Sequence, residues 1–208
     1  GPLDRIKDKF EVLGKKGAGA SFLGNLGAMG VSKGLDLLAS GIGVVTDQIG
    51  QSIEAASEMN ETLSKSRVVF GDNSREIEKW GDTAARAFGT SKNDAIAAAS
   101  SFADLFNTVG LGAGKAQGMS TKLVELSADL ASFHNIAGGS VEVLEKLRSG
   151  LSGEAEPMRR LGVFLSETKV KAKAAELGLG GAHGELSEGE KILARYNIIL
   201  DETKTAQG

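Results

Sequence analysis

The sequence predicts an all-α protein of short amphipathic helices separated by glycine-rich turns, arranged either as a bundle or as an extended helical array. Apolar residues recur along most of the chain at steps of three and four, which is the period of an α-helix. Aromatic residues make up only 5% of the 208 residues, and proline occurs twice. Glycine occurs 29 times. Strands would require more alternating β-branched and aromatic residues than this chain carries.

The bulk composition excludes several classes of function. With 41% hydrophobic and 25% charged residues, the chain is apolar enough to fold. The formal net charge of −3 gives no global attraction for nucleic acid, although local basic patches remain open. The absence of cysteine excludes disulfides, thiolate nucleophiles and cysteine-ligated zinc. Because the chain starts at Gly1 without a methionine, we expect it to be a piece of a longer protein.

Two segments are expected from the shift in composition along the chain. Residues 1–50 combine a short N-terminal helix with a glycine-rich apolar stretch, in which ten glycines fall between Gly14 and Gly50. Residues 51–208 form a domain of more regular helices. Within this domain, residues 178–184 contain four glycines and are a plausible hinge.

Helix starts are predicted where a polar side chain that can cap an N-terminus precedes an apolar run. Five positions meet this description: Asn73, Ser91, Ser140, Ser166 and Ser187. A glutamate three residues after Asn73 and after Ser187 predicts a capping box at both. Pro157 marks a further start, since proline is tolerated in a first turn.

Helix ends are predicted at glycines, which adopt the left-handed conformation that closes many helices. Gly89, Gly162 and Gly178 are expected to end helices, and Gly110, Gly112 and Gly114 to form one turn. The helix before Gly178 is expected to turn Val170, Ala174 and Leu177 inward.

The clearest periodic signal runs through the middle of the second segment. Six apolar residues there follow one another at steps of 3, 4, 3, 4 and 3: Ala116, Met119, Leu123, Leu126, Leu130 and Phe133. This spacing is that of a heptad seam, and we expect these residues to mediate helix packing. The run is short, so it favours helix-on-helix packing and does not by itself require a coiled coil.

Motifs that would indicate chemistry are incomplete. Gly110 to Lys115 is reminiscent of a phosphate-binding loop, but Val109 stands where the motif needs glycine and Ala116 where it needs Ser or Thr. His134 and His183 lie in different segments without a carboxylate at metal-binding spacing. We therefore expect no enzymatic activity, no cofactor and no metal.

The glycine-rich stretch leaves two interpretations open, namely buried packing in a larger assembly and insertion into a membrane. Gly17–Ser32 contains sixteen residues without a charge, and small residues let helices pack closely in lipid. About 20 apolar residues are needed to span a bilayer, and Asn25, Lys33 and Asp36 interrupt the run. The residues of the possible membrane segment are Phe22, Leu23, Leu26, Met29, Leu37, Leu38, Ile42, Val44 and Val45.

From about Ala55 onward, several blocks of sequence resemble the helical domain of phage tail tape measure proteins. The blocks are Ser66–Asp72, Trp80–Ala85, Ala128–Phe133, Leu147–Val163, Ala172–Gly178 and Ala194–Tyr196. The most distinctive is Leu147–Val163, which we call the 147–163 motif. Its characteristic residues are Leu151, Gly153, Glu154, Pro157, Arg159, Arg160, Leu161 and Gly162.

The resemblance implies a structural and assembly protein of the virion. Such proteins occupy the tail lumen, help set tail length and take part in genome delivery. The implied partners are sister copies in a homo-oligomer such as a trimer, tail tube and tail tip proteins, and tail assembly chaperones. The implied locations are the virion, the host cytoplasm during assembly and the host membrane at infection. No catalytic residue and no specific nucleic-acid recognition are carried over.

Overall fold

The computed structural model describes residues 54–180 and 185–208. The chain divides into two compact units, Gly1–Ser57 and Glu58–Gly208, and the second contains nearly all of the described residues. The predicted all-α class is confirmed, because the described residues form helices and turns without a strand. The expected N-terminal segment 1–50, with the nine apolar residues from Phe22 to Val45, lies outside the described residues, as do residues 181–184 of the expected hinge.

The described part starts with helical residues 54–70, which are followed by nine elements. In order, they are η1 (Gly71–Asn73), α4 (Ser74–Phe88), α5 (Lys92–Thr108), α6 (Ala113–Phe133), α7 (Gly139–Ser152), α8 (Glu156–Arg159), α9 (Glu167–Glu176), α10 (Glu188–Glu202) and η2 (Lys204–Ala206).

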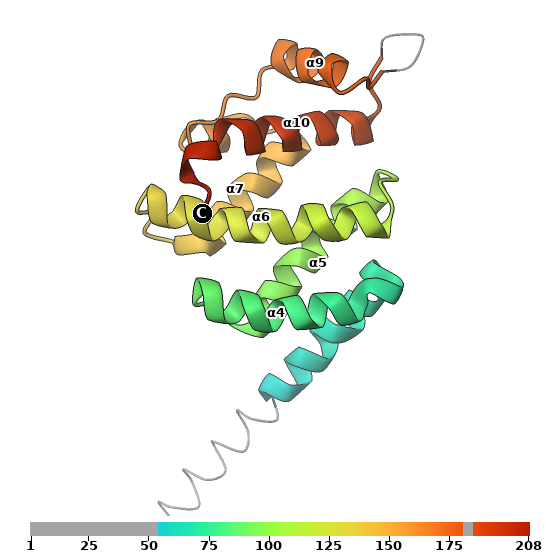
Figure 1. The fold of residues 1–208 in the computed structure, drawn as a ribbon, viewed down its shortest axis with the longest axis vertical. Coiled ribbons are helices and arrows are strands. Elements are labelled where there is room, and N and C mark those ends of the chain that lie inside the picture. The colour runs from blue at the N-terminus through green and yellow to red at the C-terminus, as the bar shows by residue number, and fades with distance from the viewer. Residues whose placement is uncertain (1–53, 181–184) are drawn as a thin grey trace, which may run out of the picture. The chain divides into compact units, whose positions relative to one another are not determined.

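The helices of the second unit form a stack in which consecutive helices pack on one another. From α4 to α8 each helix contacts the next, while α10 packs on both α9 and α7. Figure 1 shows α4, α6 and α10 lying across the view one above another, with α5 and α7 passing between them at an angle. The open choice between a bundle and an array is thus answered by a stack, which runs from the helical segment before α4 to α9 (Figure 1).

The core runs through the whole stack as a single cluster of buried residues, and α6 lies at its centre. This helix is buried well beyond the predicted seam, since Ser120, Val124 and Ser127 are also inside. The two serine hydroxyls donate hydrogen bonds to the carbonyl oxygens of Ala116 and Val124 in the same helix, so no polar atom of theirs is left unpaired. Small side chains at these positions let neighbouring helices approach α6 closely.

Several helices end in the same way, with a left-handed glycine and a backbone hydrogen bond from the residue after it. After α5, Gly110 adopts a φ of +81°, and the amide of Leu111 bonds to the carbonyl oxygen of Phe106 at 3.0 Å. After α9, Gly178 adopts a φ of +69°, and Leu179 bonds to Ala174 at 2.8 Å. This is the Schellman arrangement, in which an apolar residue after the glycine folds back on the helix. Leu111 and Leu179 accordingly pack against the core.

The predicted serine caps are confirmed at three helices. Ser91, Ser166 and Ser187 each accept a hydrogen bond from the backbone amide three residues ahead. At Ser187 the capping box is complete, because the Glu190 carboxylate in turn accepts from the Ser187 amide at 2.8 Å. Pro157 lies in the first turn of α8, as expected.

Two predicted caps are wrong. Asn73 makes no side-chain cap hydrogen bond, because the chain enters α4 directly from η1 and Asn73 itself has helical backbone angles. Ser140 lies inside α7, which starts at Gly139 with Gly138 as its N-cap. In both places helical structure starts before the polar residue, so its side chain does not cap the helix.

Two further expectations near helix ends need correction. Gly114 belongs to the first turn of α6 and not to the preceding turn, because α6 already begins at Ala113. Leu177 is 39% exposed, because α9 ends at Glu176 and Leu177 is its C-cap residue, where the chain turns. Val170 and Ala174 are buried.

Candidate interaction site at the turn between α7 and α8

The predicted packing seam lies along α6, in the core that this helix shares with α5 and α7. Five of its six residues are at most 9% exposed: Ala116, Met119, Leu123, Leu126 and Leu130. The sixth, Phe133, is not a packing residue, because its side chain is 60% exposed. It is the last residue of α6, and the chain turns away at His134, so that no described helix covers it. Its ring instead meets His134 edge-on at 5.1 Å between centroids.

The 147–163 motif forms the turn at which α7 meets α8. Leu151 closes α7 and is fully buried, and Leu161, after α8, is 2% exposed. Met158 of α8 lies directly against the backbone of α7 at Gly150. A methyl group at residue 150 would lie 2.6 Å from the Met158 sulfur, so the glycine permits this close approach. The apolar half of the motif is therefore used to pack α8 on α7.

An arginine from α10 closes the C-terminal end of α7. Arg195 donates from Nη1 to the carbonyl oxygen of Leu151 at 2.9 Å. Its guanidinium also lies against Gly153, where the φ of +111° and the lack of space both favour glycine. Cations stabilise helix C-termini, whose last carbonyls have no partner within the helix. Burial lowers the pKa of Arg195, but the group remains charged at any ordinary pH.

The charged half of the motif faces outward. Glu154, Glu156, Arg159 and Arg160 are all exposed. Arg159 and Glu156 form an ion pair at 3.3 Å, with side chains 61% and 84% exposed. Pairs exposed to this degree contribute little to stability. These four side chains therefore contribute little to the stability of the fold, and they are accessible to other molecules.

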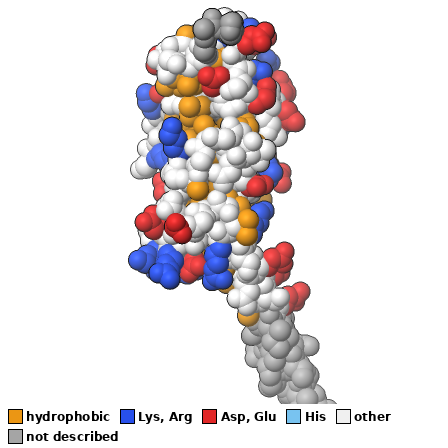
Figure 2. All heavy atoms as spheres, turned by 90° about the vertical axis from the view of Figure 1, so that its right-hand side faces the viewer, with side chains coloured by type: hydrophobic (Ala, Val, Ile, Leu, Met, Phe, Trp, Pro, Cys, Tyr) orange, Lys and Arg blue, Asp and Glu red, His pale blue; other side chains and the backbone are white. Residues whose placement is uncertain are grey.

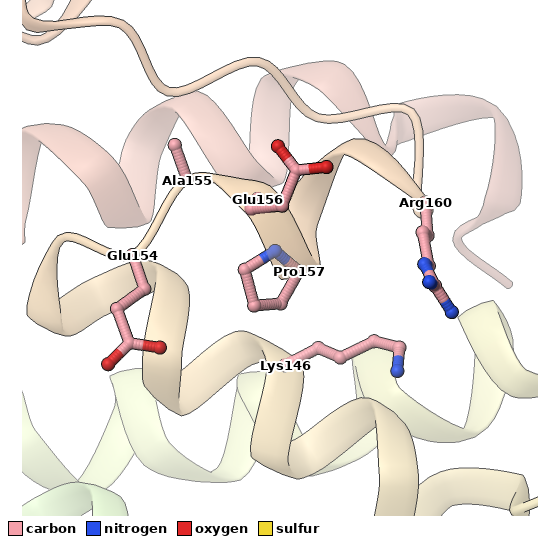
Figure 3. Close-up of a pocket in the computed structure, with 6 residues that line it drawn as sticks. All are labelled: Lys146, Glu154, Ala155, Glu156, Pro157 and Arg160. Atoms are coloured by element: carbon pink, nitrogen blue, oxygen red, sulfur yellow. The ribbon is translucent and has the colours of Figure 1, made fainter.

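These outward residues border a groove of about 520 Å³ between α7 and α8. Its lining consists of Lys146, Glu154, Ala155, Glu156, Pro157 and Arg160 (Figure 3). In Figure 3 the proline ring lies above the stem of Lys146, with Arg160 at one end of the groove and Glu154 at the other. The groove therefore has a cationic end and an anionic end separated by an apolar floor.

The cationic end of the groove is held in place by Glu142. Lys146 donates to this carboxylate, and its side chain is only 15% exposed. The hydrogen bond from Lys146, followed by its charge and by that of Arg160, lowers the pKa of Glu142. Lys146 is thus fixed in position, while Arg160 is left exposed for a partner.

A second groove, of about 540 Å³, is lined by Gly153 and by residues of α9, α10 and the segments next to them. Gly153, Leu165, Val170 and Leu186 line its apolar part, and Glu167, Lys171, Glu185, Lys191 and Arg195 line its polar part. Lys171 pairs with Glu167 at 2.8 Å, and Lys191 with Glu188 at 2.6 Å. In the first groove Lys146 is paired in the same way, but Arg160 has no ion pair among the described residues, whereas Arg195 of the second groove is bonded to the carbonyl of Leu151. The first groove is therefore the better candidate for recognition.

Other chemistry has little support in the described part. Within residues 54–180 and 185–208, no group of three His, Cys, Asp or Glu side chains is placed to hold a metal ion. The helices of these two ranges include none with the length and apolar character of a membrane span. His134 is exposed at the end of α6, and Gly110–Lys115 joins α5 to α6, so the segment before it is a helix as expected.

Comparison with known proteins adds no relative. No family model, curated protein or solved structure matches the chain. Its function must therefore be inferred from its own residues, from their geometry and from the resemblance of the sequence blocks described above.

The roles of three residues of this site were not predicted from the sequence, although Arg195 and Gly150 lie in the blocks that carry the resemblance. Arg195 contacts a carbonyl 44 positions away in sequence, and no local pattern signals such a contact. Lys146 was indistinguishable from other lysines on a helix surface. Gly150 carried a signal, because a glycine in the middle of a regular helix costs about 1 kcal/mol and usually has a packing reason.

Proposed function

We propose that this chain is a module of a phage tail tape measure protein, acting as a structural and assembly component in the tail lumen. The main support is the 147–163 motif, in which the resemblance to that family is strongest. Its apolar residues hold α7, α8 and α10 together, while four of its five charged residues line or flank an open groove. A motif divided in this way suits a protein that presents a rigid surface to partners.

The partners we propose are sister copies of the chain, tail tube and tail tip proteins, and tail assembly chaperones. The groove would accept a segment with an acidic and a basic side chain on either side of an apolar contact. Charge complementarity of this kind gives specificity and orientation more than raw affinity. We do not assign an enzymatic activity or a cofactor to the module.

The stacked architecture also bears on how such a module contributes to length. A straight helix advances about 1.5 Å per residue, which makes an extended helical chain a ruler. In this unit consecutive helices fold back on one another, so the same residues span a shorter distance. We infer that the module is a folded body on the ruler and not part of its measuring rod.

The proposal can be tested in phage particles that carry this chain. Reversing both ends of the groove with Glu154→Lys and Arg160→Glu should reduce the yield of complete tails, counted by electron microscopy. The control is Asp104→Lys with Lys115→Glu, which reverses two exposed charges on α5 and α6 and also keeps the net charge. Normal yield from the groove variant, or absence of the chain from purified virions by mass spectrometry, would contradict the proposal.

A second candidate function is favoured by the uncharged stretch Gly17–Ser32, which lies outside the described residues. We propose as the alternative a membrane-active module that forms or lines a channel through the host membrane. The chain should then bind phospholipid vesicles and release an entrapped dye. Replacing Leu37 and Leu38 with aspartate should abolish both effects, whereas retention of both by the variant would exclude the segment as the cause.

A further inference from the structure

The outer face of α4 carries a row of three cations. Arg75, Lys79 and Arg86 are all exposed. At 3.6 residues per turn, their spacing of four and eleven residues places the three side chains within about 40° of one another around the helix. They span about 16 Å along its axis at 1.5 Å per residue. We refer to these three residues as the α4 cationic row.

Two of the three acidic residues of α4, Glu78 and Asp82, pair with cations outside this row, although Asp82 lies on the same face of the helix as the row. Glu76 accepts a hydrogen bond from Gln117 of α6 at 2.9 Å, and Asp82 pairs with Lys92 at 2.9 Å. Glu78 lies 3.9 Å from Arg67. Among the described residues, no carboxylate lies within ion-pair distance of the row, in contrast to most lysines of α9 and α10. The three cations of the row are therefore exposed and have no ion pair among the described residues, while α4 as a whole carries as many acidic as basic residues.

The row also lies near one end of the stack. The opposite face of α4, with Ile77, Gly81 and Ala84, is buried, and α4 contacts α5 and α6. Figure 2 shows Lys and Arg side chains gathered at the end of the body where α4 lies. The helical segment 54–70 also meets α4, through Arg67 and Glu78, but the three side chains of the row stay exposed and accessible to a long partner.

We propose that the α4 cationic row binds the phosphate backbone of duplex DNA without reading its sequence. The centres of protein–protein interfaces are rich in aromatic and apolar residues and poor in charges. None of the large hydrophobic side chains found exposed in the described part belongs to α4. Arginine and lysine without an apolar centre are instead typical of phosphate contacts. This binding would occur whether or not the chain belongs to a tail.

The dimensions of the row are compatible with one DNA strand. At 3.4 Å per nucleotide of a strand, about 16 Å corresponds to about five nucleotides. Three phosphate contacts predict a slope of about −2.7 for the logarithm of the binding constant against that of the salt concentration. We expect weak binding that is measurable at low salt and disappears at high salt.

The test is fluorescence anisotropy of a labelled mixed-sequence duplex of about 30 base pairs, titrated with the full chain across a range of salt concentrations. The row variant is Arg75→Gln, Lys79→Gln, Arg86→Gln. The control is Arg159→Gln, Lys171→Gln, Lys204→Gln, which removes three exposed cations that each pair with an acid. Circular dichroism verifies that both variants fold.

The row variant should bind at least about tenfold more weakly at low salt and lose most of its salt dependence, while the control stays within about twofold of the wild type. Absence of wild-type binding at low salt, or an equal loss in both variants, would overturn the proposal. So would displacement of the duplex by polyglutamate at the same charge concentration as unlabelled DNA, because the surface would then suit an acidic protein.

Discussion

Helices α4 and α10 have the same length of 15 residues but are buried to different degrees. The buried residues of α4 are Ser74, Ile77, Gly81 and Ala84. Those of α10 are Gly189, Ile192, Ala194, Tyr196, Ile198 and Ile199. At 100° per residue, the set of α4 lies on one face, whereas Ala194 and Ile198 of α10 lie opposite the other four. α4 therefore packs on one side and α10 on two.

The difference follows from the place of each helix in the stack. α4 lies near one end of the stack, so part of its surface stays exposed and carries the cationic row. α10 lies between α9 and α7, and it also meets the end of α5, where the ring of Tyr196 packs edge-on against Phe106 at 6.1 Å between centroids. Neighbours, more than helix length or propensity, therefore determine how much of a helix is buried in this protein.

The largest expected effect comes from the second buried face of α10. Ile198 is 1% exposed, and Ile198→Ala should lower the free energy of unfolding by about 2 to 5 kcal/mol through lost burial and a cavity. The matched change on α4 is Thr83→Ala, opposite Ser74, which should alter it by less than about 0.5 kcal/mol. Urea unfolding followed by the fluorescence of Trp80, the only tryptophan, measures both. Similar values for the two variants would disprove two-sided burial of α10.

A buried glycine on each helix allows a second comparison of how tightly α10 and α4 are packed. A methyl group at Gly189 would lie 2.6 Å from the backbone oxygen of Val109, so Gly189→Ala should cost about 1 to 3 kcal/mol. At Gly81 the nearest atoms belong to the buried side chain of Ile96, at 2.8 and 2.9 Å, which would have to shift but is less constrained than a backbone oxygen. Gly81→Ala also gains about 1 kcal/mol of helix propensity, so its net effect should be smaller. A larger loss from Gly81→Ala in thermal unfolding would contradict this ranking.

Substitutions at the N-cap residues of α10 and α4 should differ less in their effect on the free energy of unfolding. Ser187→Ala removes the capping box of α10 and should cost about 1 kcal/mol. Asn73→Ala removes a side chain that makes no cap hydrogen bond at α4 and should leave the free energy of unfolding nearly unchanged. A larger loss for Asn73→Ala in urea unfolding would mean that the Asn73 side chain does stabilise the start of α4.

A further effect is expected only at alkaline pH. Burial, followed by the charge of Glu125, raises the pKa of Tyr196 to about 12, whereas no titratable residue is buried on α4. Because the folded state favours the neutral phenol, this contribution to stability is present below pH 10 and is lost as the pH rises from about 10 to about 12. Tyr196 is the only tyrosine, so the absorbance of tyrosinate reports its pKa. A midpoint near 10 in the folded protein would show that the ring is solvated.

Much of the fold could be predicted because its signals are local. The period of the apolar residues predicted helices, and glycines such as Gly110 and Gly178 predicted their ends, since a left-handed residue closes a helix wherever it occurs. The capping box at Ser187 involves residues three apart and was predicted for the same reason. Asn73 has the same local pattern without the cap, because the preceding helical segment continues through η1 into α4.

The candidate site was predicted only in part. The 147–163 motif was singled out by resemblance, but its division into packing and groove residues depends on α10, which lies more than thirty positions later at Arg195. Phe133 fits the spacing of the seam as well as Leu130 does, yet it is exposed because the chain turns at His134. Periodicity identifies a face of a helix, but it does not show where the covering helix ends.

By itself, the sequence determined that this protein is helical, where most of its helices begin and end, and which side chains are suited to a core. These properties depend on backbone geometry and on contacts within a few residues. Only the tertiary structure decided that α10 is buried on two faces, that α4 keeps part of its surface exposed, and that Arg195 closes α7. The physical reason is that burial and charge pairing depend on which distant helix comes to lie alongside, and helices of similar amphipathic character do not specify this in their local sequence.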